Sequence, residues 1–132
     1  MNINELVMFP TQLTDVETVR FHAEKMAAKV KSEFSISAEV KGEVLDEKTG
    51  RSNIIIKVEN EDYYIEEEKI GIFEFEETIE DERLAIQFME VQGVRILWSY
   101  IREDLYSISS KMLPRPIMIP TIDVMQTLEK AE

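Results

Sequence analysis

Apolar and polar residues alternate from Phe34 to Val44, the repeat of a β-strand with one buried face and one face in water. The apolar members are Phe34, Ile36, Ala38, Val40, Gly42 and Val44. Turn-forming residues follow at 46–50, and a second alternating segment carries Ile54, Ile56 and Val58 on one side. The pattern therefore predicts two strands joined by a short turn.

A third strand is predicted from about residue 63 to 77, but its apolar positions change phase. Ile65 is at an odd position, whereas Ile70 and Ile72 are at even ones. A slip of one residue would turn apolar side chains away from the core, so we expect a β-bulge near Gly71. The three strands then form an antiparallel meander.

Helical spacing occurs near the N-terminus and again after the strands. Thr14 and Glu17 fit a capping box, and the apolar residues that follow predict a helix over about 15–30. A longer helix is predicted over about 94–112, where Pro114 stops it. It carries two apolar sets, of which one can pack on the sheet and the other can meet a partner. The first set is Val94, Leu97, Trp98, Ile101, Leu105, Ile108 and Met112, and the second is Ile96, Tyr100 and Tyr106.

Shorter elements flank the long helix. A helix capped by Thr78 or Asp81 is predicted to end at Gly93. Residues 116–122 read as an extended edge strand, because prolines are tolerated at a sheet edge, and Met125 with Leu128 predicts a short closing helix. We therefore expect an α+β fold: a four-stranded antiparallel sheet, built from the meander and this late edge segment, with a long packing helix and a short C-terminal helix.

Length and charge narrow the class of protein. The chain has 132 residues, enough for one domain spanning 1–132, with residues 1–32 as an N-terminal helical extension. Its formal net charge is −12, which argues against nucleic acid as a partner, and it has no cysteine, which fits a reducing compartment. No apolar run is long enough to span a membrane and no secretory signal is present, so we expect a cytoplasmic location.

The residues that catalysis usually needs are missing. His22 is the only histidine, and neither a nucleophile–base pair nor a glycine-rich phosphate loop is present. Neighbouring acids such as Glu66 and Glu67 point to opposite faces of a strand, so they do not converge on a metal. We expect no enzyme activity, no cofactor and no metal site.

Two surfaces remain as candidates for binding. Acidic residues gather on the predicted water-exposed sheet face, which is either a solvated face or a partner surface. The segment 112–120 is too apolar and irregular for a bare loop, and it is either core filling or the lining of an adaptable apolar groove, since Met side chains fit many shapes.

The residues of the long helix and its C-terminal loop resemble the SecB family of protein-export chaperones over about residues 34–128. The helix motif is Ile96-Leu97-Trp98-Ser99-Tyr100-Ile101-Arg102-Glu103, followed by the bracketing prolines Pro114 and Pro120. Upstream, Gly71-Ile72-Phe73 is similar to a Gly-Ile-Phe of the family's third strand, and Glu66 falls on the position of an acid that contacts the SecA motor. Ser99 replaces a family proline, and Ile122-Asp123 replaces a family Asn-Phe.

The resemblance implies a dimer or tetramer that holds unfolded polypeptides in apolar grooves without ATP and can deliver them to the Sec export machinery. Three residue groups follow as expectations. The client groove is expected at Ile54, Ile56, Phe73, Phe75, Met112, Leu113, Ile117, Met118 and Ile119. The acidic partner face is expected at Glu39, Glu43, Glu66 and Glu68. The oligomer seam is expected at Val94, Trp98, Ile101, Leu105 and Ile108.

Two alternatives remain open. The protein could be a dedicated chaperone of a single client, such as an antitoxin, in place of a general holdase that meets SecA. It could also be an acidic mimic that occupies a basic protein and holds no unfolded chain.

Overall fold

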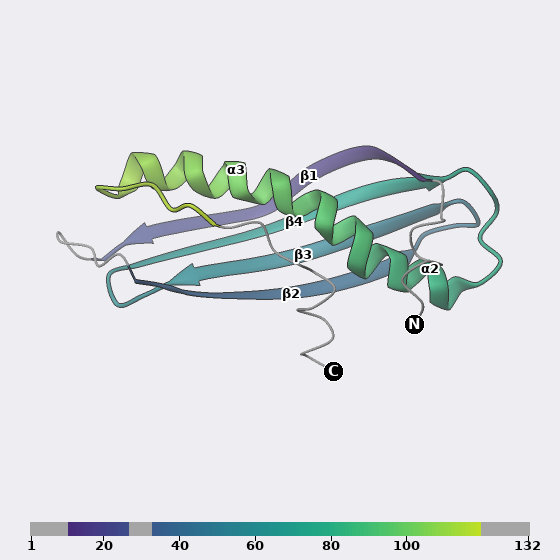
Figure 1. The fold of residues 1–132 in the computed structure, drawn as a ribbon, viewed down its shortest axis with the longest axis horizontal. Coiled ribbons are helices and arrows are strands. Elements are labelled where there is room, and N and C mark those ends of the chain that lie inside the picture. The colour runs from purple at the N-terminus through teal and green to yellow at the C-terminus, as the bar shows by residue number, and fades with distance from the viewer. Residues whose placement is uncertain (1–10, 27–32, 120–132) are drawn as a thin grey trace.

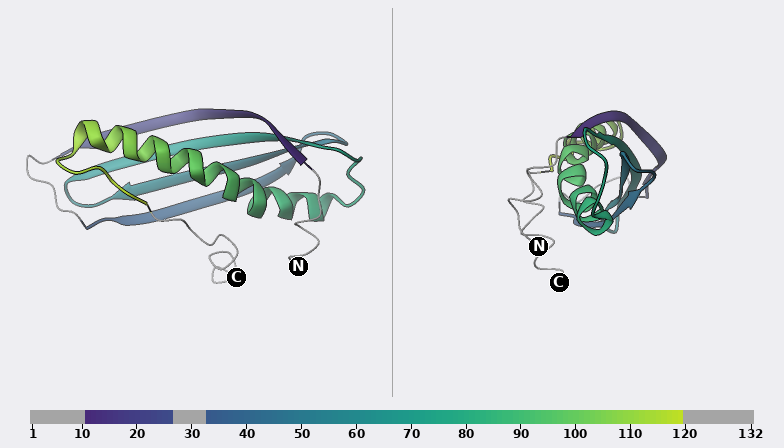
Figure 2. Two further views of the ribbon diagram at one scale, coloured as in Figure 1. Left: turned by 45° about the horizontal axis from the view of Figure 1, so that its top comes forward. Right: turned by 90° about the vertical axis from the view of Figure 1, so that its right-hand side faces the viewer.

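The computed structural model describes residues 11–26 and 33–119, which form a sheet covered on one face by helices. The strands are β1 (Thr11–Lys25), β2 (Ser35–Val44), β3 (Thr49–Glu59) and β4 (Tyr63–Phe75). They are followed by α2 (Glu82–Phe88), a π-helical turn η1 (Met89–Gly93) and α3 (Val94–Met112). Helix α3 runs diagonally across the sheet (Figure 1), and turned views show the helical layer on one face (Figure 2).

The sheet is antiparallel, with strand order β1-β4-β3-β2. The predicted meander β2–β3–β4 and the α+β class with a long helix are confirmed. The fourth strand was placed wrongly, because β1 completes the sheet whereas residues 116–119 form no strand. The predicted closing helix near Met125 and Leu128 lies outside the described residues.

The helix predicted over 15–30 is wrong, because residues 11–25 form β1 and pair with β4. Two register shifts leave Thr14 and Val19 without a direct partner in β4. Each extra residue lengthens the step between inward-facing positions from two residues to three. A strand with two such steps imitates helical spacing, which explains the error.

Strand β4 has no bulge at Gly71. Its pairs with β3 run without a register shift, and buried and partly exposed residues alternate along its whole length. Glu67 and Lys69 occupy the two inward positions between Ile65 and Gly71, so the odd-numbered phase continues through them. The apparent change of phase therefore reflects charged residues on the buried face.

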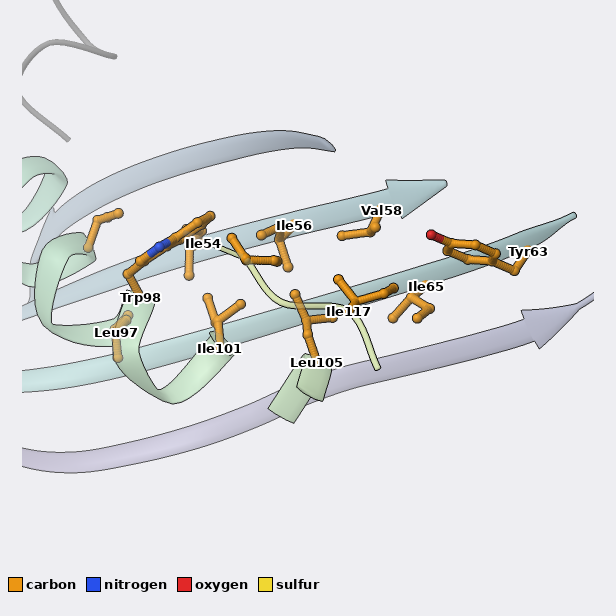
Figure 3. Close-up of a cluster of buried hydrophobic side chains, with 12 residues drawn as sticks. Ile54, Ile56, Val58, Tyr63, Ile65, Leu97, Trp98, Ile101, Leu105 and Ile117 are labelled. Atoms are coloured by element: carbon orange, nitrogen blue, oxygen red, sulfur yellow. The ribbon is translucent and has the colours of Figure 1, made fainter. Parts of the chain in front are cut away.

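The core lies between α3 and the central strands β3 and β4. Figure 3 shows Leu97, Trp98 and Ile101 of α3 lying against isoleucines of the sheet. A second cluster, around Phe73, Phe88 and Met89, fills the space beneath α2 and η1. The phenylalanine rings there meet edge to face, with centroids of Phe73 and Phe88 6.4 Å apart.

The helices begin and end at residues with a clear physical role. Asp81 caps α2, since its Oδ1 accepts a hydrogen bond from the Leu84 amide at 3.2 Å. Gly93 does not end the helix as predicted, because its backbone is helical and the chain continues into α3. Helix α3 ends at Met112, and Leu113 is extended, as expected for a residue before proline.

Gly93 is required by the close approach of the helix to β3. A Cβ at this position would lie 2.9 Å from the Ser52 Cβ and 3.1 Å from the Phe73 ring, and it would also clash with the Ser52 hydroxyl. That hydroxyl donates a hydrogen bond to the Met89 carbonyl at 2.6 Å. The contact brings the π-helical turn down onto the sheet.

We predict that Gly93→Ala destabilises the protein by about 1–3 kcal/mol, the usual cost of overpacking. In an exposed helix the same change would stabilise by about 0.5–1 kcal/mol. Urea unfolding measures the effect. Gly93→Ala should destabilise less when it is made together with Ser52→Ala, because the hydroxyl that the added Cβ would clash with is then absent. A stabilising Gly93→Ala would contradict the close contact.

Candidate functional site

The two apolar sets of α3 have different environments. Val94, Leu97, Trp98, Ile101 and Leu105 are buried against the sheet of the same chain. The oligomer seam expected at Val94, Trp98, Ile101, Leu105 and Ile108 therefore needs correction. Four of these residues are core, and Ile108 is half-buried beside them. The four core side chains are too buried to contact a second subunit.

The second apolar set of α3 faces outward. Ile96, Tyr100 and Tyr106 are exposed, with Tyr106 at 49%. Met118, in the segment after the helix, is 76% exposed, the largest value among the exposed large hydrophobic residues of the described chain. Of these exposed side chains, Tyr106 and Met118 lie close together, because both line the same hollow.

A hollow of about 410 Å³ lies where α3 meets the segment 113–119. It is lined by Ser99, Arg102, Glu103, Tyr106, Ile117, Met118 and Ile119. Apolar side chains thus stand beside one cation and one carboxylate, a mixture suited to a peptide, which has apolar side chains and a polar backbone.

The Leu113 amide donates to the Ser109 carbonyl at 2.8 Å, and two hydrogen bonds to side chains of α3 hold the rest of the segment 113–119. The Ile117 amide donates to the Ser109 Oγ at 2.7 Å, and the Arg102 Nε donates to the Ile119 carbonyl at 2.7 Å. Ile117 and Ile119 point into the core on either side of Met118. The hollow therefore has one wall of helix and one wall of anchored extended chain.

Most of the nine residues expected in the groove do not face this hollow. Ile54, Ile56, Phe73 and Phe75 are buried in the core, and Met112 and Leu113 are half-buried. Ile117 and Ile119 border the hollow but are themselves buried, so Met118 alone of the nine is exposed. Sequence reasoning left out Arg102, Glu103 and Tyr106, although Tyr106 belongs to the second apolar set recognised on the helix.

The acidic face lies on the opposite side of the sheet from the helices. Glu39, Glu43, Glu66 and Glu68 occupy outward positions of β2 and β4, and Glu39 is exposed. The other three are already engaged. Glu43 forms an ion pair with Arg51, and Glu68 accepts a hydrogen bond from the side-chain Nδ2 of Asn53 at 2.8 Å. The surface is therefore a mixed charged face, with fewer free carboxylates than the net charge suggests.

Glu66 is the most constrained of these acids. It accepts a hydrogen bond from the Tyr64 hydroxyl, and its Oε1 lies 2.5 Å from the Arg20 guanidinium. The Tyr64 hydrogen bond, with the nearby cations, lowers the Glu66 pKa. The same bond raises the pKa of Tyr64 to about 12. Glu66 is therefore a carboxylate held in a fixed position at neutral pH.

A second hollow, of about 510 Å³, lies at the other end of β4. It is lined by Thr11, Gln12, Lys48, Glu74, Phe75 and Glu76. None of these is an exposed large apolar residue, so this hollow offers little to an unfolded chain.

His22 lies on β1, 3.5 Å from Glu24, with its ring 5.9 Å from that of Tyr64. Within residues 11–26 and 33–119, no three histidine or acidic side chains group to hold a metal ion. No helix of the described chain is long and apolar enough to cross a membrane.

Comparison with solved structures finds proteins of similar fold. The Mycobacterium tuberculosis SecB-like chaperone Rv1957, in complex with a ChAD peptide from the Rv1956 HigA1 antitoxin, matches with a TM-score of 0.68 and 18% identity. The match covers 90% of this chain and 91% of that chain. The fold is SecB-like.

A second solved structure matches this chain less closely. A protein of unknown function from Streptococcus agalactiae matches with a TM-score of 0.53 and 11% identity, over 85% of this chain and 98% of that one. No protein-family model matches the sequence, and no curated protein does. The SecB-like resemblance found in the helix motif is therefore confirmed by three-dimensional structure.

We predict that the two faces of α3 respond differently to truncation. Leu97 is fully buried and Ile96, its neighbour, is 40% exposed. Leu97→Ala should cost about 2–5 kcal/mol of unfolding free energy, and Ile96→Ala about 0.5 kcal/mol or less. Urea unfolding at several protein concentrations measures both. Equal costs would show that the faces are not divided as described, and a concentration-dependent cost at Ile96 would reveal a subunit contact there.

Proposed function

We propose that this protein is an ATP-independent chaperone that holds unfolded segments of other polypeptides at the hollow between α3 and the segment 113–119. The observation that carries the proposal is the exposure of Tyr106 and Met118 at the mouth of this hollow, beside Arg102 and Glu103. The SecB-like fold supports it, because a chaperone of that fold has been seen with a peptide bound.

Apolar burial supplies the driving force in this proposal. Burial contributes about 25 cal/mol per Å² of apolar surface, and ordering the client offsets part of the gain. A client that buries its side chains against Tyr106 and Met118 needs no defined sequence, because the unbranched Met side chain adapts to different shapes. We expect broad, moderate affinity for apolar segments.

A dedicated client is the narrower form of the same proposal. The similar Mycobacterium tuberculosis chaperone was seen with a peptide from an antitoxin. By analogy, the physiological client of this chain could be one protein, such as an antitoxin. Pull-down from native lysate separates the two forms: one dominant partner favours dedication, and many unfolded proteins favour a general holdase.

Delivery to the Sec machinery is a further proposal, for which the acidic face is the candidate surface. Glu66 is held in place by Tyr64 and Arg20, and Glu39 is exposed, where a basic partner can reach it. Association with SecA that weakens on Glu39→Gln would support this role.

Self-association through α3 would have to use exposed residues such as Ile96 and Tyr100, because the other apolar stripe of the helix is buried in the core. Light scattering, which gives the molar mass, tests this.

The test of the main proposal is suppression of aggregation. Purified protein at near-stoichiometric amounts should keep two unrelated refolding clients from aggregating. The double variant Tyr106→Ser/Met118→Ser should weaken this effect about tenfold or more, because it removes about 1.4 kcal/mol or more of apolar contact. Lack of suppression by the unmodified protein would refute the holdase role.

Leu45→Ser provides the matched control. Leu45 is also an exposed large apolar residue, but it lies in the turn between β2 and β3 and does not line the hollow. This variant should suppress aggregation as the unmodified protein does. Equal loss in both variants would mean that apolar surface in general, and not the hollow, holds the client.

Salt separates the chaperone from the acidic mimic. Apolar binding should persist at about 1 M salt, where charge interactions between exposed groups are screened within about 3 Å. Capture that is confined to basic proteins and lost on adding salt would favour the mimic.

A further inference from the structure

Glu67 is a carboxyl group in the middle of an apolar layer. It is 0% exposed, and its direct neighbours across the sheet are Ile56 of β3 and Phe21 of β1. A buried carboxylate is costly unless it is paired or protonated. The surroundings of Glu67 therefore decide whether it carries a charge.

Three side chains from three elements meet Glu67. The Thr18 hydroxyl of β1 donates to its Oε2 at 3.3 Å. The Lys69 ammonium of β4 lies 3.6 Å from the same oxygen and 2.6 Å from the Oδ2 of Asp104, on α3. The remaining oxygen, Oε1, is buried and receives no hydrogen bond from a neighbouring donor. A hydrogen bond between the Glu67 and Asp104 carboxyl groups therefore needs a proton on one of them. β3 contributes only the apolar Ile56 at this point.

The charges in this cluster do not balance without a proton. Two carboxylates share one ammonium, and Lys69 is itself 6% exposed in its side chain. Burial, followed by the hydrogen bond with Asp104, raises the Glu67 pKa to about 8, against the lowering effect of Lys69. Burial alone would raise the Asp104 pKa, but hydrogen bonds with Glu67 and Lys69 together lower it. At neutral pH the proton therefore resides on Glu67.

We propose that a proton on Glu67, shared with Asp104 beside the Lys69 ammonium, links α3 to β4. This link, which we call the clasp, opens when the proton leaves. The proposal stands whether or not the hollow binds a client. Loss of the proton leaves two carboxylates facing each other across the helix–sheet interface with one ammonium between them. Asp104 is partly exposed, so the repulsion is relieved by moving its part of α3 toward water.

Movement of α3 would reach the hollow. Arg102 and Ser109, on either side of Asp104, anchor the segment 113–119 through Ile119 and Ile117. A clasp at Asp104 therefore controls the position of both walls. Mildly alkaline pH is the condition that opens it.

The effect on stability has a definite sign. The Glu67 pKa is raised from its ordinary value of 4.5 to about 8, so its contribution to folding stability is complete below pH 4.5 and declines up to about pH 8. Glu67→Gln has the shape of the protonated group and cannot lose a proton. The urea midpoint of the unmodified protein should therefore fall relative to that of Glu67→Gln as pH rises from 5 to 9.

Two measurements on the full chain test the clasp. Carbon-13 NMR of the glutamate carboxyls should show one group titrating near pH 8, absent in Glu67→Gln. Asp104→Asn should move this titration to lower pH, because a raising neighbour is lost, and Lys69→Met should move it to higher pH. Titration of Glu67 near 4.5, or shifts of the same sign in both variants, would overturn the proposal.

Hydrogen exchange of α3 reports the opening itself. Amide exchange around Asp104, expressed as the ratio of unmodified protein to Glu67→Gln at each pH, should rise severalfold between pH 7 and pH 9. Glu68→Gln is the matched control, since Glu68 adjoins Glu67 in sequence but faces the other side of the sheet, and its ratio to the unmodified protein should stay constant. If the ratio of exchange in the unmodified protein to exchange in Glu67→Gln does not change with pH, the proton does not hold α3 in place.

Discussion

The structure depends on the contact between α3 and the inner face of β3 and β4. Leu97, Ile101 and Leu105 are fully buried there, against isoleucines whose own exposure is close to zero. The helix can approach so closely because Gly93 has no side chain and because Ser52 meets the Met89 carbonyl. This contact fixes which side of α3 faces water, and the position of the candidate site follows from that orientation.

Most of the sheet and the long helix could be predicted, because β2, β3 and α3 keep a constant period. The failures have physical causes. Strand β1 contains two extra residues, Thr14 and Val19, and the resulting three-residue steps imitate a helix. In β4 the inward positions hold the ionisable residues Glu67 and Lys69. No pattern of apolar residues reveals that such groups can be buried, here because Glu67 is protonated and Lys69 pairs with Asp104 of α3.

The candidate site was predictable only in part, because the sequence does not show how many of the apolar residues the core uses. The sequence reading recognised an apolar surplus around α3 and the segment after it, but hydrophobicity alone does not tell which residues are surplus. The helix stripe and the strand isoleucines are fully consumed by one chain's core. What remains for a partner is the smaller outer set, including Tyr106, together with Met118. The deciding factor is the rotation of α3 about its axis, which follows from tertiary packing.

The segment 113–119 shows how a small fold can expose apolar surface and stay ordered. Its backbone is fixed to α3 through Ser109 and Arg102, and Ile117 and Ile119 are buried on either side of Met118. The ordering cost of this wall is therefore met by folding, before any client arrives, which leaves more of the binding energy for affinity. Met118 is exposed, and under the proposed function its unbranched side chain can adapt to clients of different shape. A fixed backbone that carries an adaptable apolar side chain is the combination that the proposed holding of unfolded chains requires.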